Sequence, residues 1–246
     1  MKLPEGHRVI HFERIDSTNS EARRLVEAGE LGPLWIWSDE QTVGRGRLGH
    51  TWISEPGNLY VTCLFQTGAP EISAVQISFV AAIAVYEMVL KLNPNGNFLL
   101  KWPNDVLKGG AKFCGLLSEI VGTNPTQIAL GCGINLAHAP VLSNYPVTSL
   151  GQGFKPEAVL SAFAMEFWRW MEIWHEGRGF PTIRNAWLQR TRGVGQQVTV
   201  DGTAGTFAGL GIDGALLVKY GDGRQKSVYA GEVHFIDIDK MRHGKK

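Results

Sequence analysis

A run of twelve residues at positions 41–52, QTVGRGRLGHTW, limits the folds open to this chain more than any other feature. Its glycines match the Gly-x-Gly-x-x-Gly pattern of dinucleotide-binding folds, which requires a strand before the glycines and a helix after them. A strand is expected over 34–38, but residues 50–57, HTWISEPG, have no helical period and end in a Pro-Gly pair. This excludes a nucleotide-dependent dehydrogenase, and no Gly-x-x-x-x-Gly-Lys-Ser/Thr sequence indicates a P-loop.

The same run is typical of a loop that folds over an anionic ligand. Glycine permits positive φ angles and a close approach of the backbone to a ligand. Arg45 and Arg47 each present a planar, permanently charged fork that fits phosphate and carboxylate oxygens. Taken alone, a run of this kind is more often a solvated, charged hairpin, so the choice depends on the rest of the chain.

Length, charge and cysteine usage exclude several classes of protein. The chain has 246 residues, 44% of them hydrophobic, which suits one large and one small domain. A formal net charge of +1 disfavours a dedicated nucleic-acid surface. No apolar run approaches the roughly 20 residues of a membrane helix, and Cys63, Cys114 and Cys132 lack metal or redox spacing. We therefore expect a cytoplasmic protein with reduced thiols, no membrane contact and no metal held by protein ligands alone.

Hydrophobic periodicity predicts a mixed α+β region before residue 190. Strands are expected at 9–15, 34–38, 58–65, 98–101, 112–121 and 127–134. Helices are expected from Thr18, over 73–92 and from Pro156, where aromatic residues recur at helical spacing. Glycines at 131 and 133 interrupt the last strand, which indicates a bulge or a group lying close to the backbone.

From Gly193 onward the chain changes to short β-runs separated by Asp-Gly turns. The turns begin at Asp201, Asp213 and Asp222, and the runs lie at 196–200, 206–210, 215–220, 226–229 and 233–238. Strands this short and this regularly interrupted predict a small β-barrel. We therefore divide the chain into a larger domain over 1–190 and a barrel domain over 191–246.

Three short polar residues, Ser17, Thr18 and Asn19, are candidates for contacts with a neutral polar ligand. Thr18 and Glu21 have the spacing of a capping box at the start of a helix. Capping alone therefore explains these residue types, and the ligand interpretation needs support from elsewhere.

The turn Lys101–Asp105 and the nearby Lys112 form a second candidate cluster. An Asn-Asp pair at a strand end facing a lysine could hold an activated carboxyl group and a nucleotide phosphate. A hairpin with an exposed ion pair explains the same residues, and the spacing does not decide between the two.

Five short motifs occur in order along the chain: Asp16-Ser-Thr-Asn19, Gln41 with 44–52, Lys101-Trp-Pro-Asn-Asp105, Lys112-x-x-Gly115-Leu-Leu117 and Gly131-x-Gly-Ile-Asn135. Each motif is weak alone, but the ordered set is specific. In this set the chain resembles the biotin protein ligases of bacteria, from about residue 8 to its end.

The resemblance implies a fold and a two-step reaction. The fold is α+β, with a mixed sheet flanked by helices as in class II aminoacyl-tRNA synthetases, followed by a small SH3-like barrel. Biotin and ATP would first form biotinyl-AMP and release pyrophosphate, with magnesium accompanying the nucleotide. Biotin would then pass to one lysine of a biotin carboxyl carrier protein, part of a biotin-dependent carboxylase.

The resemblance also implies roles for individual residues. The expected biotin contacts are Ser17, Thr18, Asn19, Gln41, Arg45, Gly46, Arg47, Lys112 and Gly115. The expected nucleotide contacts are Trp52, Asn104, Asp105 and Asn135, with Trp52 stacked on the adenine and Asn135 bonded to it. Asp105 is also expected near the magnesium ion. Arg47, Lys112 and Asp105 are the expected catalytic residues, because positive charge must be fixed where charge develops. Leu48 and His50 stand where the family often has arginines, which could weaken loop ordering or nucleotide affinity.

Two other functions compete with this interpretation. A lipoate ligase or octanoyltransferase shares the fold, but the Gly-Arg-Gly-Arg loop with the Trp-Pro-Asn-Asp turn favours biotin. A non-enzymatic biotin-binding regulator is disfavoured by the presence of Arg47 and Lys112. Only some 15 residues precede the Asp16 motif, too few for the helix-turn-helix of repressor relatives, so we expect no sequence-specific DNA binding. A homodimer is allowed.

Overall fold

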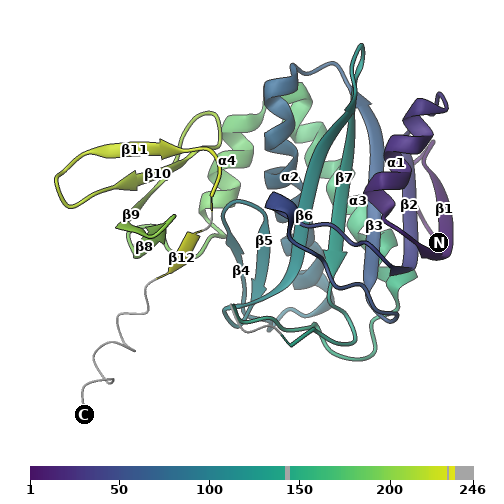
Figure 1. Cartoon of the computed structure of the whole chain (residues 1–246), viewed down its shortest axis with the longest axis horizontal. Helices are drawn as coiled ribbons and strands as arrows, with labels where there is room; N and C mark the ends of the chain where they lie inside the picture. Colours follow the sequence, from purple (N-terminus) through teal and green to yellow (C-terminus); the bar gives the residue numbers. More distant parts are fainter. Residues whose placement is uncertain (142–144, 232, 236–246) are drawn as a thin grey trace.

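The computed structural model describes residues 1–141, 145–231 and 233–235, which form two β-sheets and four α-helices (Figure 1). The larger sheet contains β1 (Arg8–Ile15), β2 (Leu34–Gln41), β3 (Leu59–Thr67), β4 (Phe98–Lys101), β5 (Asp105–Lys108), β6 (Ala111–Gly122) and β7 (Thr126–Ile134). The helices are α1 (Thr18–Glu27), α2 (Gln76–Leu92), α3 (Pro156–Trp174) and α4 (Phe180–Leu188). The smaller sheet contains β8 (Gln197–Val200), β9 (Thr203–Leu210), β10 (Leu216–Lys219), β11 (Gln225–Val228) and β12 (Val233–Phe235).

The larger sheet is mixed. Its strand order is β1-β2-β3-β7-β6-β5-β4, in which β1 and β2 are parallel and all other neighbours are antiparallel. Strand β3 and the long β6–β7 hairpin therefore form its centre. A mixed sheet flanked by helices is the predicted α+β fold class, which is confirmed.

The two faces of this sheet pack on different helices because strand side chains alternate in direction. On one face, a small apolar cluster lies under α1 and comprises Ala22, Leu34, Ile36, Leu64 and Ala129. On the other face, the alternate residues Trp35, Cys63 and Leu130 join the main core, to which α2 and α3 contribute. The candidate functional site lies on the same face as α1, whose first residues line it.

The smaller sheet has the order β11-β10-β9-β8-β12 and is antiparallel throughout. Its turns fall at the predicted Asp-Gly pairs, where Gly202, Gly214 and Gly223 have φ angles of 81°, 89° and 82°. Within the described residues β11 and β12 do not pair with each other, so the sheet is an open form consistent with the expected SH3-like barrel. Residues 236–238 of the last expected strand lie outside the described residues.

The segment after α4 joins the two sheets. Leu100 N–H donates to Arg190 O (2.8 Å), and Arg192 N–H donates to Leu100 O (2.9 Å), so this segment extends the edge of β4. Apolar side chains of the smaller sheet, such as Phe207, belong to the same core cluster as α2. The division of the chain after residue 190 stays a prediction.

Some local expectations were wrong. Ser17, not Thr18, caps α1, because Ser17 Oγ accepts from Ser20 N–H (3.4 Å). A 3₁₀ turn over Glu71–Val75 precedes α2, which begins later than predicted. Asp105 starts strand β5 rather than ending a turn. Helix α4 was not expected, since its nine residues include few strong helix formers.

The expectation that no apolar run approaches membrane-spanning length was also wrong. The helical stretch Glu71–Leu92 has 22 residues and is apolar enough, by length and composition, to cross a membrane. In the part of the chain that the structure describes it is the one such stretch, and 61% of its most apolar window is buried within the protein. Burial of this kind is typical of a helix that packs in the core of a protein.

Candidate functional site

A cavity opens on the α1 face of the larger sheet, where glycines replace large side chains. Gly115 and Gly133 are paired across β6 and β7, and Gly131 lies further along β7. A Cβ at Gly133 would lie 2.5 Å from the Trp52 ring, and one at Gly131 would lie 2.4 Å from Asn19 Oδ1. The predicted close approach to these glycines is confirmed, and β7 pairs with β3 there without a bulge.

The cavity brings together residues from all five motifs. Its lining includes all the expected biotin contacts, which are Ser17, Thr18, Asn19, Gln41, Arg45, Gly46, Arg47, Lys112 and Gly115. Of the expected nucleotide contacts, the lining includes Trp52, Asn104 and Asp105 but not Asn135. The roles expected for these residues stay predictions.

One end of the cavity carries uncharged polar groups. Gln41 Oε1 accepts from the backbone N–H (2.9 Å) and the hydroxyl (3.1 Å) of Thr18, and Gln41 Nε2 donates to Ser54 Oγ (2.9 Å). Thr62 is buried in β3, and its Oγ1 lies 2.6 Å from Asn19 Oδ1 and 2.8 Å from Thr18 Oγ1. Hydroxyls and amides carry both donors and acceptors without charge, so this end suits a neutral ligand that both donates and accepts.

The other end carries a buried ion pair. Lys112 Nζ lies 2.7 Å from Asp105 Oδ1, and Lys101 Nζ lies 3.9 Å from Asp105 Oδ2. Burial disfavours the charged form of Lys112, but attraction to Asp105, its hydrogen bond and Tyr145 together raise the pKa of Lys112. The Lys112 and Asp105 side chains are only 16% and 13% exposed, so the alternative of an exposed ion pair is wrong. A fixed ammonium group therefore faces the cavity.

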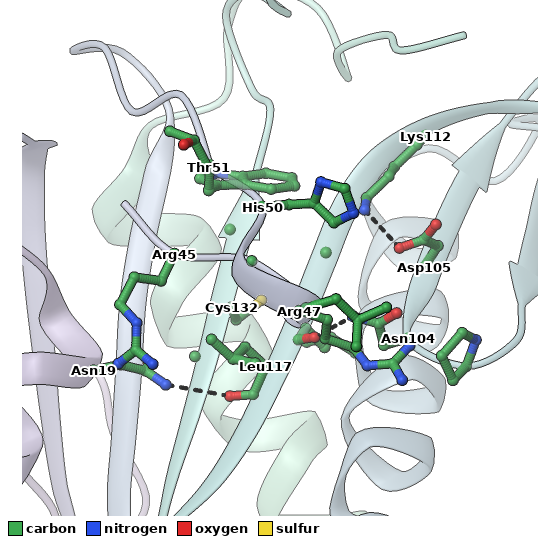
Figure 2. A pocket seen from close by; sticks show the side chains of 18 of the residues that line it. Asn19, Arg45, Arg47, His50, Thr51, Asn104, Asp105, Lys112, Leu117 and Cys132 are labelled. Carbon is green, nitrogen blue, oxygen red and sulfur yellow. Dashed lines mark hydrogen bonds and ion pairs between the residues drawn. The ribbon is translucent and has the colours of Figure 1, made fainter. Parts of the chain in front are cut away.

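The two loop arginines lie on opposite sides of the cavity, with Arg47 beside Asn104 and Arg45 beside Asn19 (Figure 2). Burial lowers the pKa of Arg47 and Asp105 offsets part of this, but a guanidinium stays charged at any physiological pH. Arg45 Nη2 lies 2.9 Å from a carboxylate oxygen of Glu119. Of the two arginines, only Arg47 is therefore placed at the charged end.

The glycine-rich loop is folded into a compact turn. Gly46 N–H donates to His50 O (2.7 Å), and Trp52 N–H donates to Gly44 O (2.9 Å). A Cβ at Gly44 would lie 2.2 Å from Trp52 O, so this crossing of the backbone requires glycine. Close approach, rather than a positive φ angle, explains that glycine.

Positive φ angles occur one turn later in the loop. Leu48 has a φ of 54° and Gly49 a φ of 79°, inside a three-residue 3₁₀ turn over Arg47–Gly49. The expectation that the loop glycines supply positive φ therefore holds for Gly49 and not for the two before it. The 3₁₀ turn is too short to be the helix of a dinucleotide fingerprint, as predicted.

Trp52 and Asn135 were both expected to contact adenine. The Trp52 ring lies over Gly133, with Lys112 Nζ 5.3 Å from the ring centroid. Asn135 is 2% exposed, and its Nδ2 donates to Thr148 O (3.1 Å). Its Oδ1 has no hydrogen-bond partner among the described residues. Both adenine contacts stay predictions.

Sequence reasoning missed two polar residues of the site, Thr62 and Glu119. Glu119 lies on β6, on the same face as Gly115 because strand residues alternate, and this period was the available signal. Thr62 is a lone polar residue in the apolar run of β3, and a buried hydroxyl needs a hydrogen-bond partner.

The structure does not favour a magnesium site made by protein ligands. In the described ranges no group of three or more His, Cys, Asp or Glu side chains could hold a metal ion. Asp105, which was expected near the ion, is instead paired with Lys112 and flanked by Lys101. Its carboxylate charge is already neutralised, so these residues do not fit the metal.

Comparison with known proteins matches both sheets to one family. Residues 11–135 match the biotin/lipoate A/B protein ligase family, and residues 193–235 match the biotin protein ligase C terminal domain. The biotin–(acetyl-CoA-carboxylase) ligase of Paracoccus denitrificans is 38% identical over 238 residues, which cover 90% of this chain and 98% of that protein. The bifunctional ligase/repressor of Bacillus subtilis is 28% identical, over 93% of this chain and 74% of its own length. The solved structure of the Aquifex aeolicus biotin protein ligase with biotin and ATP has a TM-score of 0.79 and 25% identity, covering 93% of this chain and 98% of that one.

Proposed function

The chain belongs to the biotin protein ligase family, and we propose that it joins biotin to AMP from ATP and then transfers biotin to a lysine of a biotin carboxyl carrier protein. One observation carries this conclusion. A single cavity has uncharged hydrogen-bonding groups at one end and Lys112, Asp105 and Arg47 at the other. Biotin has the same polarity, with a neutral ureido ring at one end and a carboxylate at the other.

In the first step a carboxylate oxygen of biotin attacks the α-phosphorus of ATP. A mixed anhydride forms, and pyrophosphate leaves. Both reactants are anions, so their approach is opposed until positive charge lies beside them. Lys112 and Arg47 supply that charge, and Asp105 keeps Lys112 charged and aimed in spite of its burial. Charges fixed in advance stabilise the transition state without reorganisation.

In the second step the unprotonated amine of the acceptor lysine attacks the carbonyl carbon of the anhydride. A carbon–nitrogen bond forms, the bond from the carbonyl carbon to the phosphate oxygen breaks, and AMP leaves with that oxygen as the amine loses a proton. The step needs no nucleophile from this chain. The three cysteines, which are buried free thiols, accordingly have no part in it.

Several features of the ligase rest on chemistry and sequence alone. Magnesium enters with the ATP phosphates, because it is commonly bound through substrate phosphate oxygens and Asp105 is occupied by lysines. The thiols suit the cytoplasm. The near-neutral net charge of +1 suits a ligase without sequence-specific DNA binding, and a homodimer is compatible with it.

Pyrophosphate exchange tests this function. The full chain is incubated with ATP and labelled pyrophosphate, separately with biotin, lipoate and octanoate. We expect label to enter ATP with biotin only. Lys112→Ala, as the matched control, should lose roughly 100-fold in exchange rate, as when one charge-stabilising donor is removed. Exchange driven by lipoate instead of biotin would assign the chain to the lipoate branch of its family.

A further inference from the structure

Glu119 is a carboxylate at the site that neither reaction step uses. It lies on β6, and its side chain is 18% exposed. Its Oε1 accepts from Arg45 Nη2 (2.9 Å), and its Oε2 accepts from Asn19 Nδ2 (2.8 Å). One carboxylate therefore joins the glycine-rich loop to the first turn of α1.

The bond to Glu119 fixes which way the Asn19 amide faces. A carboxylate only accepts hydrogen bonds, so Asn19 must turn its NH₂ group to Glu119 and its carbonyl oxygen away. That oxygen lies 2.6 Å from Thr62 Oγ1, so the one Thr62 hydroxyl proton is committed to it. Thr18 Oγ1 then receives no proton from Thr62 and keeps its capacity to accept from a ligand N–H. Glu119 thereby sets the donors and acceptors of the uncharged end without lining the cavity itself.

The bond to Arg45 acts on the loop. Arg45 stands at the base of the loop, where its backbone pairs with Thr51. The Arg45 side chain is 41% exposed, and ion pairs of this exposure contribute little stability by themselves. The pair therefore matters for geometry, because it holds the base of the loop at a fixed place above β6.

We propose, on the basis of the biotin ligase function above, that Glu119 is a positioning residue that couples biotin binding to loop closure. Its two oxygens hold Asn19 in the orientation that binds the ureido ring and Arg45 in the folded loop. Glu119→Ala should therefore weaken biotin binding about tenfold, as expected when a hydrogen bond to a charged group is lost. It should also shorten the time for which the enzyme retains biotinyl-AMP.

Two measurements on the full chain test the proposal, namely the Kd for biotin by calorimetry and the release of biotinyl-AMP after single-turnover adenylation. Arg45→Ala should speed release while changing the Kd less than Glu119→Ala does. The charge exchange R45E with E119R restores the ion pair, so slow release should return. The biotin Kd should stay raised, because a guanidinium at that position cannot accept from Asn19.

Glu87 supplies a matched control. Its ion pair with Arg190 has a distance of 2.6 Å and 22% exposure on each side, and neither residue lines the cavity. Glu87→Ala should lower the melting temperature but leave the Kd and the release rate unchanged. Equal effects in both variants would make Glu119 a stability residue and overturn the proposal.

The proposal would also be overturned if Glu119→Ala had the same biotin Kd and the same release rate of biotinyl-AMP as the wild type. If that variant does not fold, Glu119→Gln keeps the size of the side chain but cannot accept from both partners, so at least one measurement should change. Absence of biotin-driven exchange in the wild type would instead refute the ligase function, independently of any Glu119 variant.

Discussion

At the scale of single residues, we expect Asp105 to act through its ion-pair partner Lys112 rather than on a substrate. Burial alone would favour the neutral amine of Lys112, and the attraction of Asp105 reverses this. Asp105→Asn should therefore lower the pKa of Lys112 below that in the wild type. Adenylation needs the ammonium form of Lys112. As the pH is raised, the variant should therefore lose activity at a lower pH than the wild type does. Single-turnover adenylation measured from about pH 6 to about pH 10 tests this.

Arginine at position 112 provides the control for Asp105. A guanidinium does not lose its proton in this range. The double variant D105N/K112R should therefore keep a flat profile at high pH, even if its overall rate is reduced. If the single variant Asp105→Asn showed the same pH dependence of adenylation as the wild type, Asp105 would not be what maintains the charge of Lys112.

Residues whose chemical type the reaction demands could be predicted from the sequence to lie at the site, and they line the cavity. Lys112 and Arg47 could be assigned this way, since few other side chains carry a fixed positive charge. Glu119 could not, because its role depends on partners 74 and 100 residues away, Arg45 and Asn19. The different positions of Arg45 and Arg47 could not be predicted for the same reason, since the sequence gives their spacing but not the direction of their side chains.

At the scale of elements, the glycine-rich loop contains a strained residue. Leu48 has a φ of 54° and a ψ of 28°, in the left-handed region, and its side chain is 65% exposed. A side chain other than glycine costs roughly 1–2 kcal/mol there, and asparagine tolerates the region better. Leu48→Asn should therefore stabilise the folded loop and slow the release of biotinyl-AMP up to about tenfold.

Leu48→Ala separates backbone preference from loss of the side chain. Alanine removes the exposed leucine but has no preference for the left-handed region. Its release rate should stay near the wild-type value. Equal slowing in both variants would show that the leucine side chain, not the backbone, opposes closure.

Arg47 should hold the closed loop through the phosphate of the adenylate. Arg47→Gly removes the charge and adds conformational freedom to the open loop, and both changes favour opening. The variant should form biotinyl-AMP slowly and release it, so a bystander protein with surface lysines becomes biotinylated diffusely. Wild type should leave that protein largely unlabelled. Arg47→Lys, which keeps the charge without the fork, should fall between them. Normal retention by Arg47→Gly would refute this role.

Most strands could be predicted, because alternation of apolar residues shows which face is buried. The element β5 could not, since its four residues are held between β4 and β6 and not by any pattern of their own. The loop geometry was also beyond prediction. Gly44 is needed because Trp52 O crosses it, a contact between residues whose arrangement only the folded hairpin fixes.

At the scale of the whole molecule, the two sheets share one hydrophobic core. Phe207 and Leu216 of the smaller sheet lie in the same buried cluster as α2 and α3. Trp102 Nε1 also donates to Gly214 O across the junction (3.2 Å). A core that spans both parts leaves neither with a complete apolar interior by itself, so the parts should unfold together.

The positions of the tryptophans allow this cooperativity to be measured. All eight tryptophans precede residue 190, so their fluorescence reports chiefly on the larger sheet and its helices, although Trp102 also touches the smaller sheet at Gly214. Phe207→Ala should cost about 3–5 kcal/mol, because Phe207 is 1% exposed. In a chain of this size that lowers the melting temperature by about 10 °C. The midpoint of the fluorescence transition should fall by the same amount as the midpoint of the transition seen by circular dichroism.

Ile212→Ala provides the control, because Ile212 is 91% exposed and its truncation should shift neither transition. An unchanged fluorescence transition in Phe207→Ala would mean that the two sheets fold independently.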